Sequence, residues 1–142
     1  MGEIFKFNKD KYWLCLYTSS YFLFITFIIS FNTTKDIVIT IYYLLIFITS
    51  INYWRNPEEG IRKTIDLCFV YIGCILFLIK IYSFKDEFNM FVALCLYFCI
   101  IVFYIIEFIL AYFNCNKWVI FHMSLHIYCC LGGLIIIYES IM

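Results

Sequence analysis

Five long apolar stretches occupy most of this chain of 142 residues. Each is about 18–24 residues long, which is the length an α-helix needs to cross a hydrocarbon core of about 30 Å. The first two contain no charged residue. The sequence therefore predicts an all-α fold, a polytopic membrane bundle of about five transmembrane helices that run up and down with short loops, over residues 12–30, 37–54, 65–83, 90–113 and 118–138.

Composition leads to the same class of protein. Apolar residues make up 65% of the chain and charged residues 14%, whereas soluble domains carry about 25% charged residues. The expected surrounding is the lipid bilayer, and the connections are too short to hold a second domain, so residues 1–142 form one integral membrane domain. Ten basic and ten acidic residues balance, so nothing in the charge indicates a nucleic-acid partner.

The distribution of basic residues predicts the orientation. Lys and Arg concentrate on the cytoplasmic side of membrane proteins. Seven basic residues fall on one side of the expected bundle and three on the other. Three tryptophans begin or end runs on the more basic side, where indole rings favour the headgroup zone. We therefore expect a cytoplasmic N-terminus and a C-terminus on the opposite side. The basic residues are Lys6, Lys9, Lys11, Arg55, Arg62, Lys63 and Lys117 against Lys35, Lys80 and Lys85, and the tryptophans are Trp13, Trp54 and Trp118.

Polar residues from four of the runs fall at a similar depth. Ionisable side chains inside a membrane must face the bundle interior, a cavity or the interface. Given the expected orientation, most of them lie near the cytoplasmic ends of their helices. This shared layer is the strongest functional indication in the sequence, and it contains Ser50, Asn52, Asp66, Glu107, His122 and His126.

A repeated spacing on the third run adds to this pattern. Asp66, Gly73 and Lys80 recur every seven residues and so lie on one face of a helix. Gly73 would let a neighbouring helix approach closely. Lys80 lies near the far end and is expected to extend its amine to the headgroups.

Two histidines on the last run suggest a metal site. His122 and His126 are four residues apart, on one face of a helix and close enough to bind a single ion. Asp66 or Glu107 could supply a third ligand from another helix, and a zinc ion held there would activate water for hydrolysis. Two other interpretations stay open. The histidines could hydrogen-bond neighbouring helices as packing contacts, or they could relay protons.

Two short stretches carry polar residues that form possible motifs. One runs from Ser50 to Trp54 and is followed by Asp66, and the other runs from His122 to His126. They resemble the Ser-x-x-x-His, Asp and His-x-x-x-His motifs of the CREST superfamily, membrane hydrolases and receptors that include alkaline ceramidases and adiponectin receptors. The resemblance implies zinc-dependent amide hydrolysis.

In the resemblance, His122 and His126 would bind zinc, and Ser50 and Asp66 would assist catalysis. Trp54 occupies the position of the third zinc-binding histidine. The family also has seven helices where this chain has five runs. A zinc site able to catalyse hydrolysis would then need Glu107 in place of the third histidine ligand.

Three functional hypotheses follow. The first is a small membrane protein whose polar cluster is structural or binds a ligand, with no chemistry of its own. The second is a CREST-like metal-dependent hydrolase acting on a lipid or amide near the cytoplasmic leaflet. The third is a hydrophobic subunit that assembles with other membrane subunits. The sequence does not distinguish which membrane holds the protein.

Overall fold

The protein folds into an all-α bundle with five helices long and apolar enough to cross a membrane. The computed structural model describes residues 9–56, 60–113 and 115–142, so Lys6 and Pro57 lie outside the described residues. The predicted fold class is confirmed, and most helix ends fall within four residues of the predicted ends. The helices are α1 Lys9–Ser19, α2 Tyr21–Thr33, α3 Ile37–Trp54, α4 Ile61–Tyr82, α5 Glu87–Tyr112 and α6 Trp118–Ile141.

The first span consists of two helices rather than one. It runs over Tyr12–Thr33, but the helix is interrupted at Ser20, between α1 and α2. The hydroxyls of Thr18, Ser19 and Ser20 all donate to carbonyls three or four residues earlier, with Leu16 O accepting from both serines at 2.8 and 3.1 Å. Such back-bonding bends helices. Three consecutive hydroxyl residues therefore account for the break that hydropathy alone did not predict.

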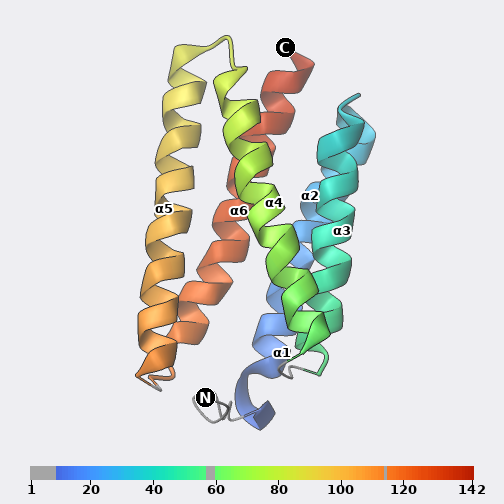
Figure 1. Cartoon of the computed structure of the whole chain (residues 1–142). Coiled ribbons are helices and arrows are strands. Elements are labelled where there is room, and N and C mark those ends of the chain that lie inside the picture. The colour runs from blue at the N-terminus through green and yellow to red at the C-terminus, as the bar shows by residue number, and fades with distance from the viewer. Residues whose placement is uncertain (1–8, 57–59, 114) are drawn as a thin grey trace.

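The helices lie roughly along one direction, and the C-terminus lies at the opposite end of the bundle from the start of α1 (Figure 1). We call the end where α1, α4 and α6 begin the α1 end. The helix α2 packs against both α3 and α6, and α5 packs along α6. The helix α4 packs on α3 and makes much less contact with α5 and α6. The bundle is therefore tight on the α2 side and loose between α4 and α5.

A stripe of small polar side chains lines the tight side. Ser20, at the junction of α1 and α2, and Thr26 and Ser30 of α2 are all fully buried. Their hydroxyls lie 3.2 Å from Ser50 Oγ, 3.0 Å from Cys130 Sγ and 2.6 Å from Thr40 Oγ1, in that order. Small residues let helices approach closely in lipid, and hydrogen bonds between them add to the packing.

Two glycines leave space that is filled by tyrosine rings from α3. The space that a Cβ would occupy on Gly73 is filled by the hydroxyl of Tyr42, and the same space on Gly133 by the hydroxyl of Tyr43. Tyr43 is fully buried and donates to Cys129 O at 2.9 Å. The expected close approach at Gly73 is thus made by a side chain, and α6 uses a second glycine in the same way.

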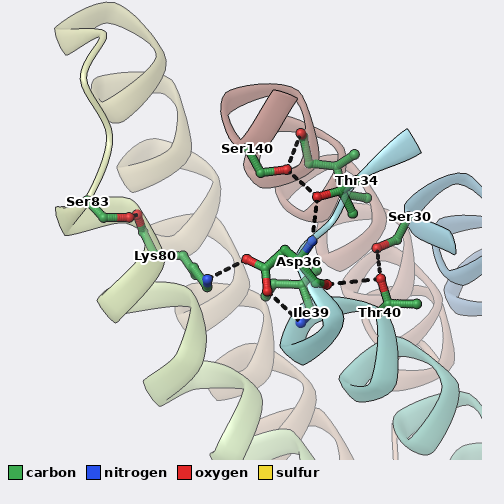
Figure 2. A network of polar contacts seen from close by, with 9 residues as sticks. Ser30, Thr34, Asp36, Ile39, Thr40, Lys80, Ser83 and Ser140 are labelled. Atoms are coloured by element: carbon green, nitrogen blue, oxygen red, sulfur yellow. Dashed lines mark hydrogen bonds and ion pairs between the residues drawn. The ribbon is translucent and has the colours of Figure 1, made fainter. Parts of the chain in front are cut away.

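A polar network ties three helices together at the end opposite α1. Lys80 of α4 pairs with Asp36, whose other carboxylate oxygen accepts the Ile39 backbone N–H at 3.3 Å and caps α3 (Figure 2). Thr34 Oγ1 lies 2.6 Å from Ser140 Oγ of α6. The amine of Lys80, expected to reach for the headgroups, instead binds the start of α3.

We expect Asp36→Asn to destabilise the protein by about 1 kcal/mol, because it removes the ion pair with Lys80. The loss is limited because the pair is partly exposed and because asparagine still caps the helix. Burial raises the pKa of the Asp36 carboxyl, but hydrogen bonds from Lys80 and Ile39 outweigh burial and hold that pKa below its ordinary value. The pair's stabilisation is therefore complete above about pH 4 and is lost as pH falls through the lowered pKa.

Thermal unfolding in detergent between pH 2 and pH 7 measures this effect. The variant should lose stability at neutral pH and show a flatter acid limb than wild type. Asp86→Asn is the matched control, because Asp86 caps α5 through the Phe88 N–H at 2.8 Å and is exposed. An unchanged acid limb in Asp36→Asn would show that the pair does not contribute.

Candidate functional site

An elongated cavity of about 470 Å³ lies in the loose part of the bundle. It is lined mainly by α3, α4, α5 and α6, with Leu23 from α2. Most lining residues are apolar or aromatic, including Val70, Phe77 and Ile100. The volume is in the range of small-molecule sites, which are mostly apolar with a few placed polar groups.

All the residues predicted to form a site line this one cavity. They come from α3, α4, α5 and α6, and they gather toward the α1 end, near Lys63 and Trp118. Asn52 belonged to the same predicted layer, but it is exposed; it is two residues from Ser50 and so faces another way on the helix. The residues brought together are Ser50, Asp66, Glu107, His122 and His126.

The two histidines are each held through the same ring atom. His122 Nδ1 lies 2.9 Å from Glu107 Oε1, and His126 Nδ1 lies 2.8 Å from Ser19 Oγ. The ring centroids are 4.8 Å apart. Ser19 had not been expected near the site, because a hydroxyl in an uncharged apolar run gives no sequence signal of its partner. The Nδ1 atom of each ring is therefore occupied, and Nε2 is the nitrogen left for another partner.

The other two predicted site residues have hydroxyl partners. Asp66 is buried, and its Oδ1 accepts from Thr49 Oγ1 at 3.1 Å. Ser50 Oγ lies 3.2 Å from Ser20 Oγ. Both contacts connect neighbouring helices at the α1 end.

Two tryptophans are buried within the bundle. Trp54 is 3% exposed and Trp118 is 8% exposed, and their rings stack with centroids 6.3 Å apart. The Trp54 ring also meets the His122 ring edge-on at 4.7 Å. That these indoles lie at the depth of the headgroup zone stays a prediction, but they pack against each other and against the histidine inside the bundle. Only Trp13 is exposed.

Three buried polar atoms around the cavity lack a hydrogen-bond partner among the described residues. They are Trp54 Nε1, Glu107 Oε2 and His122 Nε2. Most buried polar atoms in proteins are hydrogen-bonded, and each exception requires a cause such as a water, an ion or a ligand. Their three residues are in mutual contact through His122. The three residues that carry the unpaired atoms therefore adjoin one another in the cavity lining.

The zinc site expected from the sequence involves the same residues. In the described part of the chain, no group of three or more His, Cys, Asp and Glu side chains is placed to hold a metal ion. Glu107, one of the two candidates for the third ligand, contacts the Nδ1 atom of His122. That arrangement resembles an outer-shell carboxylate that orients a histidine.

No protein-family model, curated protein or solved structure matches the chain. The geometry of the cavity is therefore the basis for the functional argument that follows.

Proposed function

We propose that this small polytopic membrane protein binds a hydrophobic molecule in the cavity, and that its polar cluster contacts the ligand without catalysing a reaction. The observation that carries the proposal is the coincidence of a 470 Å³ apolar cavity with three unpaired polar atoms at one end. Burying a polar group without a hydrogen bond costs about 1–3 kcal/mol. A ligand head that pairs with these atoms recovers that cost.

The walls of the cavity support a ligand that arrives from lipid. Tyr71 of α4 and Phe108 of α5 line the cavity and are also exposed, at 54% and 60%. In a bilayer, such exposed apolar surfaces contact the acyl chains of lipids. The lining and the lipid-facing surface therefore meet between α4 and α5.

Photolabelling with an alkyl diazirine in bilayer discs tests the proposal. We expect adducts on the cavity residues Val70 and Ile100 to saturate with probe concentration and to be displaced by an unlabelled long-chain alkane. Ile75 and Ile79 on the same helix α4 are 61% and 59% exposed and serve as internal controls, with labelling that rises without saturation. Adducts at Val70 and Ile100 that rise in the same unsaturated way would contradict a binding cavity.

We also propose that the N-terminus is cytoplasmic and the C-terminus lies on the opposite side. Basic residues at the α1 end support this orientation, since among the described residues they outnumber those at the other end six to three. Single cysteines introduced at Arg55 and at Lys85 in a cysteine-free variant should react with a membrane-impermeant maleimide from the cytoplasmic and the opposite side, respectively. Labelling of both from one side would contradict the five-span topology.

A metal-dependent hydrolase is the second candidate. One observation favours it: Ser50, Asp66, His122 and His126 share one cavity, and both histidines are bonded through Nδ1, as in metal sites where the other nitrogen binds the ion. A zinc ion bound there would supply an activated water or a Lewis acid.

The variant His126→Gln distinguishes the candidates. If His126 only packs, glutamine can still exchange a hydrogen bond with Ser19, so stability should change by about 0.6 kcal/mol or less, the average for such bonds in membranes. Zinc content by elemental analysis should then be the same in wild type and variant, which is the result we expect. Stoichiometric zinc in wild type that is lost in His126→Gln would favour the hydrolase instead.

A further inference from the structure

We propose that the cavity binds a neutral single-chain lipid whose head is a vicinal diol, as in a glycerol monoester. The inference rests on the proposed function and specifies its ligand. Three features of the described residues carry it: the shape of the cavity, the hydrogen-bonding character of the three unpaired atoms, and the charge around them.

The cavity is long and narrow. Its lining extends along α4 from Lys63 to Phe77 and along α5 from Ala111 to Tyr97. Each stretch corresponds to about 21 Å of helix. A volume of about 470 Å³ distributed over that length has room for one extended chain and is too narrow for two side by side.

Polarity along this length gives the ligand a direction. The carboxylate, lysine and histidine residues of the lining lie at the α1 end, whereas the other end is formed by Tyr42, Phe77 and Tyr97. The aromatic end matches a hydrocarbon chain, and the α1 end matches its head. A ligand with one polar end and one chain satisfies both.

The unpaired atoms specify the head. The indole Nε1 of Trp54 is a donor only, and Glu107 Oε2 is an acceptor when ionised. With Nδ1–H donating to Glu107 Oε1, His122 Nε2 accepts a hydrogen bond when the ring is neutral and donates one when it is protonated. In either state the site requires both a donor and an acceptor from the ligand. Two adjacent hydroxyl groups supply two donors, and their oxygens supply acceptors.

The charges around the head favour a neutral ligand. Asp66 and Glu107 bring two carboxylates, and Lys63 and the two imidazoles bring the basic groups. A fatty-acid carboxylate would be repelled by the acidic pair, and its head has no donor for Glu107 Oε2. A quaternary ammonium has no donor at all. An uncharged diol pairs with all three atoms and adds no charge to a medium in which unbalanced charge is expensive.

The test is competition against radiolabelled 1-monooleoylglycerol, with the full chain in phosphatidylcholine bilayer discs. The competitors share one acyl chain and differ in the head: unlabelled 1-monooleoylglycerol, methyl oleate, oleic acid and oleylamine. We expect the diol to compete at least about tenfold better than methyl oleate, because one hydrogen bond with a charged partner changes affinity by about that factor.

Two variants locate the binding. Trp54→Phe removes the unpaired N–H from the head site together with part of the ring that packs on Trp118 and His122. It should weaken the diol about fivefold, the effect of one neutral hydrogen bond, while methyl oleate is unchanged. Val70→Phe fills the cavity and should abolish saturable binding of both, whereas Ile75→Phe on the lipid face of α4 should leave both intact.

The outcomes separate the two levels of the proposal. Saturable binding that Val70→Phe abolishes, with diol and methyl oleate equal in wild type, would overturn the diol inference and leave the hydrophobic site standing. A preference for oleic acid or oleylamine would overturn it in favour of an ionic head. Absence of saturable binding by every ligand would overturn the proposed function itself. The wild-type preference is measured without any variant, so misfolding of Trp54→Phe does not affect it.

Discussion

Gly133→Ala is expected to destabilise the protein by about 3 kcal/mol, because a methyl group on this glycine would occupy the position of the Tyr43 hydroxyl. Tyr43 is fully buried, so its ring can move only within the bundle, toward the cavity that it lines. Overpacking a core costs about 1–3 kcal/mol, and displacing the ring also breaks its hydrogen bond to Cys129 O. Unfolding of the purified protein by heat or by titrated denaturing detergent measures the loss.

The neighbouring glycine provides the control. A methyl group on Gly132 would make only an ordinary contact of 3.7 Å with Phe77 Cε2. Gly132→Ala should therefore be neutral, or stabilising by up to about 1 kcal/mol through helix propensity. Equal effects of the two substitutions would mean that the α3–α6 packing differs from the described one.

Glu107→Leu is expected to cost about 2 kcal/mol, because it leaves His122 Nδ1 without its acceptor inside the bundle. This exceeds the average of about 0.6 kcal/mol for interhelical hydrogen bonds in membranes, since both groups are ionisable and their side chains are only 17% and 15% exposed. Glu107→Gln keeps an acceptor for the ring and should cost less than about 1 kcal/mol.

A double-mutant cycle shows whether the two residues act together. Glu107→Leu combined with His122→Leu removes both partners and leaves no unpaired atom of the pair. The double variant should therefore cost about 1–2 kcal/mol less than the sum of the single variants. Strict additivity in unfolding experiments would contradict the contact between α5 and α6 at this point.

The fold was readable from the sequence because lipid imposes one simple requirement. A helix that spans the bilayer needs a long apolar run, and the run at residues 37–54 coincides with α3. The break at Ser20 was not predicted, because it depends on which backbone carbonyls accept hydrogen bonds from Thr18, Ser19 and Ser20. The mean hydropathy of the run carries no information about those hydrogen bonds.

The sequence predicted which residues belong to the candidate site but not which contacts they make. Depth along each helix placed Asp66, Glu107 and His122 in one layer, and they line one cavity. Their partners depend on helix rotation and pairing, which the sequence does not specify. The position of Trp54 at a helix end likewise did not indicate that its ring packs on His122.

The pair between Lys80 and Asp36 illustrates the same difficulty. It joins residues 44 positions apart. Nothing in the local pattern around either residue indicates the other, because the contact arises only when α4 packs against the start of α3.

The most direct test of the ligand-binding account is an experimental density map of the protein purified from its own membrane. We expect elongated density in the cavity between α4 and α5, with its polar end within hydrogen-bond distance of Trp54 Nε1, Glu107 Oε2 and His122 Nε2. A map in which the side chains of Val70 and Ile100 close the cavity, and in which those three atoms are bonded to the protein itself, would contradict the account.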